Sequence, residues 1–382
     1  MNTNALLITS NNGSLFEIPS LVDKWNAELG KLVTLHNPGL IAVHLQELGG
    51  KDWKRDMNKV DKSREDLLKA DYLCEYTRSV WYFDKNFANG ETFTALGSVY
   101  MFHKSLPEIK IYNLKTKSFD VIAMGTHEMY DNIHISPYCH VIRFPNEFFP
   151  QCPNWTRKGF IYTRWTIGGK PLELINIHIF HDADNRISLK ESPSLYSYNR
   201  KKALEHSLKV FSQISPFECP SFVFGDFNFR QDQCLVMSHL LENGFVPAGE
   251  HSEESVQLEH PNGDYLKVQV KKFLLKCEAL TSNGFMNMRK FDTEFASFKD
   301  VLFELPIKFS PSYPLSEDPE KPDIYNETRA PSWCDRILMN KLAHDTITKE
   351  AKDSQYFRAG NGVCLGDHKP ICLTFNLADV LK

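Results

Sequence analysis

Short apolar runs that end in polar residues recur along this chain and predict buried β-strands. Residues 5–9 and 40–45 are two such runs, and each has the length and apolar content of a strand. Between them, Leu21, Trp25 and Leu29 recur at the spacing of one helix face, which predicts a helix over residues 21–35. Strands that alternate with helices in this way are typical of an α/β domain.

The rest of the chain continues this pattern. Further strands are predicted at residues 93–102, 160–165, 172–181, 221–224 and 371–376, and further helices at residues 60–76 and 198–213. The charged section from Asp232 to Asp300 is predicted to be mostly helical. Because we find no internal repeat, low-complexity tract or linker, we predict a single domain over residues 1–382, with a helical insertion or flank around residues 232–300.

Polar side chains stand at the ends of four apolar runs and beside two later segments. In chain order this set is Asn11, Glu47, His178, Asp226, Asn228, Asp335, Asp367 and His368. Strand ends project side chains into a common crevice in α/β folds, so we expect these residues to meet. Taken singly, each has a plain interpretation as a turn residue, a rim carboxylate or a hydrogen-bonded strand histidine. The repetition of the pattern favours a shared site.

The stretch from Ser221 to Arg230 carries the densest polar group. Gly225 follows four strand-forming residues and is expected to loosen the backbone where the strand leaves the sheet. Beyond it, Asp226, Asn228 and Arg230 alternate with phenylalanines, which places the polar groups on one face of an extended chain. A carboxylate, an amide and a guanidinium on one face suit a phosphate and its metal ion. From this stretch alone, the shoulder of a β-hairpin is an equally good interpretation.

A shared site would hold several carboxylates, and these require a positive partner. Glu47, Asp226 and Asp367 cannot be buried together without cations or protons. Their oxygen ligands point to Mg²⁺, or to Mn²⁺ as a substitute, rather than to zinc. If the three residues converge, we therefore expect a divalent metal between them.

Composition limits the possible binding partners of the protein and the cellular compartment in which it is expected. The formal net charge of −4 gives no overall electrostatic footprint for nucleic acid or an anionic membrane. Nine cysteines without CxxC pairs argue against a disulfide framework or a zinc site. The N-terminus lacks the features of a signal peptide, no apolar run could span a bilayer, and the C-terminus carries no CaaX box. We expect a cytoplasmic protein, membrane-associated if a lipidated tail is missing from this chain.

Three motifs give the chain a family resemblance. Gly225-Asp-Phe-Asn-Phe-Arg230, Pro331-Ser-Trp-Cys-Asp-Arg-Ile-Leu338 and Gly366-Asp-His-Lys-Pro370 resemble the signature motifs of inositol polyphosphate 5-phosphatases. Among these the chain most resembles the type I enzymes, and the resemblance covers nearly the whole chain. The family belongs to the superfamily that includes deoxyribonuclease I and apurinic endonucleases. The resemblance implies an α/β fold, a four-layer α/β sandwich with two central mixed β-sheets.

The resemblance also implies a role for each polar residue of the set. It implies that the metal ligands are Glu47, Asn11 and Asp367, and that the groups acting on the attacking water are Asp226 and Asn228. It implies that the groups acting on the scissile phosphate and the leaving oxygen are His368, oriented by Asp335, and His178. The implied substrate-binding residues are Lys158, Arg157, Asn228 and Tyr313.

The function implied is the Mg²⁺-dependent hydrolysis of the 5-phosphate of inositol 1,4,5-trisphosphate and inositol 1,3,4,5-tetrakisphosphate, which would terminate calcium-release signalling. A phosphoinositide-lipid 5-phosphatase is the nearest alternative, but we find no apolar, basic-rimmed loop that would face a membrane. A catalytically silent inositol-phosphate-binding scaffold would have no need of Asp226. A nuclease of the same superfamily is disfavoured by the acidic charge balance. The expected partner is therefore a small inositol phosphate, without nucleic acid or an integral membrane segment.

Three positions depart from the family pattern. Pro314 and Leu315 follow Tyr313, where many family members have lysine and tyrosine. This departure leaves recognition of the neighbouring ring phosphate to another basic residue. Asn12 stands where the type I pattern usually has an apolar residue.

Overall fold

Two β-sheets form the centre of the computed structural model, which describes residues 4–149, 157–215, 218–249, 255–349 and 353–381. The first sheet has the strand order β17-β18-β1-β2-β4-β3-β7. Its strands are β1 (Asn4–Asn11), β2 (Leu40–Gln46), β3 (Arg78–Phe83), β4 (Gly97–Phe102), β7 (His127–Tyr130), β17 (Gln355–Arg358) and β18 (Ile371–Asn376). It is mixed, because β1 runs parallel to β2 but antiparallel to β18.

The second sheet has the strand order β16-β11-β10-β9-β5-β6, and β8 pairs with β9 beside this path. Its strands are β5 (Ile109–Asn113), β6 (Ser118–Val121), β8 (His140–Arg143), β9 (Gly159–Ile167), β10 (Lys170–His178), β11 (Ser221–Asp226) and β16 (Asp335–Met339). This sheet is also mixed, since β10 and β11 are parallel and β16 is antiparallel to β11.

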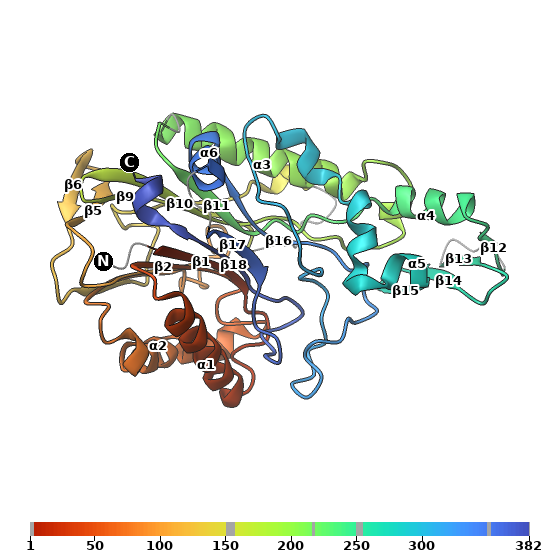
Figure 1. Ribbon diagram of the computed structural model, residues 1–382, viewed down its shortest axis with the longest axis horizontal. Helices are drawn as coiled ribbons and strands as arrows, with labels where there is room; N and C mark the ends of the chain where they lie inside the picture. The colour runs from red at the N-terminus through yellow and green to blue at the C-terminus, as the bar shows by residue number, and fades with distance from the viewer. Residues whose placement is uncertain (1–3, 150–156, 216–217, 250–254, 350–352, 382) are drawn as a thin grey trace.

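Helices cover the outer faces of both sheets (Figure 1). Apolar residues of α1 (Pro19–His36) and α2 (Trp53–Leu68) pack on the first sheet, and those of α3 (Leu195–Ile214) pack on the second. The facing sides of the two sheets meet in a continuous apolar core that includes Leu7, Leu174 and Phe224. The predicted four-layer sandwich with two central mixed sheets is therefore confirmed.

Short elements complete the chain between and after these layers. They are η1 (Asp71–Leu73), η2 (Asn146–Phe148), η3 (Ile187–Leu189), α4 (Gln233–Glu242), α5 (Glu278–Thr281), η4 (Asn283–Phe291), η5 (Glu294–Phe298), α6 (Lys341–Lys349) and α7 (Leu377–Val380). The helix predicted at residues 60–76 ends earlier, at Leu68, and η1 follows as a separate short turn.

The section around residues 232–300 differs from the prediction of a mostly helical insertion. After α4 it forms a third, four-stranded antiparallel sheet, which lies beside α4 and α5 at one end of the molecule (Figure 1). Its strands are β12 (Val246–Pro247), β13 (Ser255–Glu259), β14 (Tyr265–Gln269) and β15 (Lys272–Lys276). Leu258, Leu266 and Val268 alternate with polar or tyrosine neighbours and are buried together with Phe273, so the period in this stretch is that of strands.

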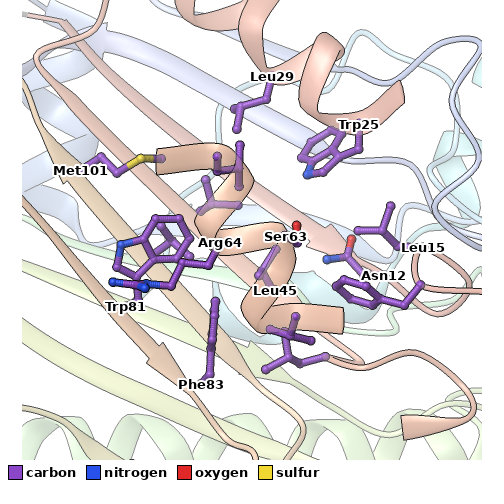
Figure 2. A pocket seen from close by; sticks show the side chains of 16 residues that line it. Asn12, Leu15, Trp25, Leu29, Leu45, Ser63, Arg64, Trp81, Phe83 and Met101 are labelled. Atoms are coloured by element: carbon purple, nitrogen blue, oxygen red, sulfur yellow. The ribbon is translucent and has the colours of Figure 1, made fainter. Parts of the chain in front are cut away.

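A small cavity of about 40 Å³ lies between the first sheet and its helices (Figure 2). Most of its wall is apolar, and Trp25 and Trp81 face it from opposite sides. Asn12 lies at its edge, where Oδ1 accepts a hydrogen bond from Ser10 Oγ at 2.7 Å and the backbone N–H donates to the Gln46 carbonyl at 3.0 Å. Because both groups are satisfied, a polar residue is tolerated at this buried position.

His44 joins the two sheets behind the strand ends. Its ring stacks on Phe224 with the centroids 3.5 Å apart, Nδ1 donates to the Phe224 carbonyl at 3.1 Å, and Nε2 lies 3.0 Å from the Tyr100 hydroxyl. A neutral ring can make both hydrogen bonds, because Nδ1 then donates to the carbonyl and Nε2 accepts from the hydroxyl. Burial lowers the pKa of His44 to about 3, although the bond to Phe224 opposes this shift.

We therefore expect acid to destabilise the fold through His44. The native ring stays neutral while the unfolded chain takes up a proton below its ordinary pKa of 6.5, so this contribution to stability is lost as pH falls from 6.5 toward 3. Between pH 6.5 and 5 the loss should reach about 2 kcal/mol. Urea unfolding should show a steeper fall for the wild type than for His44→Gln, with His260→Gln as the control. Parallel curves for wild type and His44→Gln would contradict the assignment.

Candidate active site

The register of the strands brings the predicted polar residues to one edge of the sandwich. His178 and Asp226 are the last residues of β10 and β11 and lie opposite each other, and Asp226 lies opposite Asp335, the first residue of β16. In the first sheet, Asn11 ends β1, and Glu47 follows the last residue of β2. Because these strand ends share one edge, residues far apart in sequence form one crevice.

Asp226 is the centre of this crevice and is fully buried. Its Oδ2 accepts hydrogen bonds from Asn11 Nδ2 and Asn228 Nδ2, each at 3.0 Å, and its Oδ1 accepts from the Asn228 backbone N–H at 2.8 Å. His178 Nε2 and His368 Nε2 lie 3.3 and 3.8 Å from Oδ2. Burial alone would raise the pKa of Asp226, but the neighbouring His368 and His178 outweigh it and hold the pKa well below its usual range. Asp226 is therefore ionised.

His368 is held between two carboxylates. Its Nδ1 lies 2.8 Å from Asp335 Oδ2, which also accepts a hydrogen bond from Ser312 Oγ at 2.6 Å. Burial would lower the pKa of His368, but the charges of Asp335 and Asp226 prevail and raise it to about 10. The ring is therefore a fixed imidazolium whose Nε2 faces Asp226.

His178 has the opposite electrostatic environment. It is buried beside the Lys158 ammonium, and both effects lower its pKa, to about 4. Its Nε2 is shared between Lys158 Nζ and Asp226 Oδ2, so it either accepts from the lysine or donates to the carboxylate. Burial also lowers the pKa of Lys158, to about 8. The crevice therefore contains one charged and one neutral histidine.

Glu47 stands at the mouth of the crevice in a strained backbone conformation, with a φ of 54°. Its Oε2 lies 3.9 Å from Arg157 Nη1. Burial would raise the pKa of Glu47, but the charges of Arg157 and Lys158 outweigh it and lower the pKa. A side chain at Gly13 would begin 3.4 Å from Glu47 Oε2 and 3.7 Å from Asn11 Oδ1, so both oxygens face this glycine.

Asp367 enters from the last loop, immediately before His368. Its Oδ1 lies 3.9 Å from His368 Nε2, and its backbone carbonyl accepts a hydrogen bond from Leu315 N–H at 2.8 Å. Asp226, Asp335 and His368 also offer ligand atoms within 4.8 Å of one another, so the crevice contains an acidic cluster that could hold a metal. Because His368 Nδ1 is already bonded to Asp335, a cation in the crevice would be held by carboxylate and amide oxygens rather than by this nitrogen.

This chain is similar in sequence to known proteins over nearly its whole length. The family model described as Endonuclease/Exonuclease/phosphatase family 2 matches residues 146–374. Human inositol polyphosphate-5-phosphatase A is 40% identical over 389 residues, which cover 98% of this chain and 93% of that protein. The probable type I inositol 1,4,5-trisphosphate 5-phosphatase of Caenorhabditis elegans is 33% identical over 416 residues, covering 97% and 99%. This chain belongs to the inositol polyphosphate 5-phosphatase family.

Membership in the 5-phosphatase family makes the chain a phosphatase and confirms the resemblance drawn from its three motifs. A solved structure of the inositol polyphosphate 5-phosphatase domain of SpSynaptojanin, in complex with inositol (1,4)-bisphosphate and calcium ion, aligns with 98% of this chain and 84% of that one. The aligned residues are 14% identical, and the TM-score is 0.48.

Tyr313, one of the residues predicted to bind substrate, is buried within the 5-phosphatase crevice. The Tyr313 ring is buried between the Arg230 guanidinium, 4.0 Å from the ring centroid, and the His368 ring, 4.7 Å away. Arg230 also donates through Nη2 to Asn228 Oδ1. In this position Tyr313 supports the charged histidine from behind.

Sequence reasoning missed two supports of the 5-phosphatase site. Ser312 holds Asp335 through its hydroxyl, although nothing in the sequence separates it from other loop serines. Gln46 Nε2 donates to Asn176 Oδ1 at 2.8 Å, and Asn176 Nδ2 donates to the Gly97 carbonyl at 2.7 Å. These amides join the two sheets next to Asn11 and His178. Their position near strand ends is the feature of the sequence that could have predicted this contact.

Gly225 has a different role from the one predicted. The strand does not leave the sheet there but continues to Asp226. A Cβ at Gly225 would lie 1.8 Å from the Ile177 carbonyl oxygen, so the close approach of β10 excludes a side chain. The glycine therefore allows Asp226 to stand beside His178.

We expect Gly225→Ala to separate β11 from β10 and to destabilise the fold by ~3 kcal/mol, in the range of overpacked cores. Thermal or urea unfolding measures this loss. Gly169→Ala is the comparison, because a Cβ at that turn meets nothing within 4 Å although its φ of 80° adds some strain. Unchanged stability of Gly225→Ala would show that the backbones do not approach so closely.

Proposed function

We propose that this phosphatase removes the 5-phosphate of soluble inositol polyphosphates, namely inositol 1,4,5-trisphosphate and inositol 1,3,4,5-tetrakisphosphate, with Mg²⁺ as its cofactor. In a cell this reaction would terminate calcium-release signalling. One observation carries the proposal: an ionised, fully buried Asp226 lies within 4 Å of a histidine held as a cation. Such a pair suits a reaction in which water attacks a phosphate that carries negative charge.

The chemistry requires positive charge and a positioned water. A phosphomonoester is dianionic, repels hydroxide and has a poor alkoxide leaving group. We assign Asp226 to orient the water and accept its proton, because the carboxylate is ionised and fixed by three hydrogen bonds. Asn228 donates two of these bonds and would steady the same water or a phosphate oxygen.

Three cations would neutralise the transferred phosphoryl group. His368 would donate from Nε2, because its Nδ1 is held by Asp335 and the ring keeps its charge. Lys158, which lies beside His178, would bind a phosphate oxygen, with Arg157 as a weaker contact next to Glu47. His178, neutral and next to Lys158, would donate to the phosphate or the leaving oxygen. Tyr313 would contribute by holding His368 in place.

The residues at the mouth fit a hard divalent cation. Asn11 donates through Nδ2 to Asp226, which leaves Oδ1 as an oxygen ligand, and Glu47 Oε2 faces the same glycine as this atom. Asp367 adds a third oxygen donor on the side of His368. Carboxylate and amide oxygens are the ligands of Mg²⁺, and Mn²⁺ could replace it. When bound, the ion would supply positive charge to the phosphate and lower the pKa of a water.

The names of the relatives support the proposed substrate class. The two relatives named above are called phosphatases of inositol polyphosphates or of inositol 1,4,5-trisphosphate. Within the described residues, the helices are all too short or too polar to cross a bilayer.

Incubation with inositol 1,4,5-trisphosphate, the matching phosphoinositide in vesicles and an abasic-site duplex would separate the soluble, lipid and nuclease activities. Loss of the 5-phosphate from the soluble compound supports the proposal, and cleavage of the duplex alone would refute it.

Removal of the metal should abolish turnover. We expect no phosphate release in EDTA and full recovery with excess Mg²⁺, since the oxygens of Glu47, Asn11 and Asp367 are proposed to hold the ion that the reaction requires. Glu47→Gln should raise the Mg²⁺ concentration required for half-maximal activity by about tenfold or more, because it removes a charged ligand. Undiminished release in EDTA would exclude the metal-dependent mechanism.

Loss of the proposed base should slow turnover without unfolding the protein. We expect Asp226→Asn to lower kcat by about 10²- to 10⁴-fold, the usual contribution of a general base. Circular dichroism and thermal unfolding would establish that the variant folds, and Asp345→Asn on α6 is a control outside the site. Near-normal kcat in Asp226→Asn would mean that another group takes the proton.

A further inference from the structure

An ion pair crosses the mouth of the proposed substrate site. Lys51 Nζ contacts both carboxylate oxygens of Glu317, which lies 266 residues later in the chain. The two side chains are partly exposed, at 48% and 36% of their full area. Surface ion pairs of this kind contribute little to stability, so the contact can be broken at small cost.

The backbone of Lys51 is fixed beside the proposed metal ligands. Its N–H donates to the Gly13 carbonyl at 2.9 Å, and Gly13 is the glycine that Glu47 and Asn11 face. The carbonyl of the preceding residue, Gly50, accepts a hydrogen bond from Arg157 Nη1 at 3.3 Å. Lys51 therefore presents its flexible ammonium from a fixed position on the rim.

Glu317 is anchored on the opposite rim. Two residues before it, Leu315 N–H donates to the Asp367 carbonyl, and Ser316 N–H donates to the Ile324 carbonyl at 2.7 Å. The Glu317 carboxylate therefore lies on a loop that is bonded to the backbone of Asp367. A second negative charge at this place opposes the entry of a polyanion.

Two other cations of the crevice already have partners in its interior. Lys158 is buried against His178, and Arg230 is buried on the face of Tyr313. Pro314, which follows Tyr313, carries no charge. Lys51 is a partly exposed ammonium at the mouth, long and flexible enough to turn from one anion to another.

We propose that Lys51 binds a ring phosphate that is not cleaved, and that Glu317 holds Lys51 only until the substrate displaces it. This inference rests on the proposed function. A phosphate carries up to two negative charges against one for the carboxylate, so the ammonium gains by the exchange. Glu317 then competes with the substrate, and the two residues affect substrate binding in opposite directions.

Steady-state kinetics with inositol 1,4,5-trisphosphate in Mg²⁺ tests the exchange. We expect Lys51→Ala to raise KM about tenfold with kcat within twofold, the size of one lost charge-assisted hydrogen bond. Glu317→Gln should lower KM by about two- to fivefold, because it frees the lysine and removes a repelling charge. Lys51→Arg should retain most of the wild-type KM.

Matched controls lie on the same two segments. Lys54→Ala changes an exposed lysine three residues from Lys51, and Glu320→Gln changes an exposed glutamate on the loop of Glu317. Both should leave KM within twofold of the wild type. If they shift KM as much as the test variants do, the effect is one of overall charge and the assignment is wrong.

A structural role for the ion pair would give a different result. It predicts that Lys51→Ala and Glu317→Gln both lower thermal stability and change KM in the same direction, and that outcome would overturn the inference. So would a KM for Lys51→Ala within twofold of the wild type, while the wild type hydrolyses the trisphosphate. No 5-phosphate release by the wild type would instead overturn the proposed function and this inference with it.

Discussion

The site is built around one buried negative charge, the carboxylate of Asp226, placed where the two sheets meet. A lone carboxylate in such a position is costly, so the surrounding groups must compensate for the lost water. Asn11 from the first sheet and Asn228 from the second supply hydrogen bonds, and His368 supplies a positive charge. The same contacts that make the charge tolerable also hold the two sheets in register at their edge. Stability and the arrangement for catalysis are therefore coupled at this residue.

The opposite states of the two histidines follow from their neighbours. His368 lies between Asp226 and Asp335 and keeps its proton, whereas His178 lies beside Lys158 and stays neutral. Two rings near one carboxylate can thereby perform different tasks, one as a fixed cation and one as an adjustable donor. The negative residues then form two groups. Asp226 and Asp335 determine the protonation state of His368, whereas Glu47 and Asp367 lie at the mouth, where they suit a metal ion.

Much of the fold and the membership of the site could be predicted from the sequence, because strand ends at Asn11, His178 and Asp226 carry their polar residues at regular positions. The third sheet was missed because the charged residues of the 232–300 section masked the alternation of Leu266 and Val268. Contacts between loops were inaccessible for a different reason. Ser312 with Asp335, and Lys51 with Glu317, meet only through tertiary packing, and local patterns contain no information on such pairs. Gly225 was noticed, but only the structure shows that neighbouring backbone excludes a side chain there.

The central claim is that residues distant in sequence surround one hard cation. Titration of the protein with Mn²⁺, followed through the imidazole signals in an NMR spectrum, tests this claim most directly, because a paramagnetic ion broadens the signals of nearby nuclei. We expect His178 and His368 to broaden together at the lowest Mn²⁺ concentrations, before His260 in the turn after β13, and excess Mg²⁺ to reverse the effect. Broadening of His260 first, or of only one of the two crevice histidines, would contradict this claim.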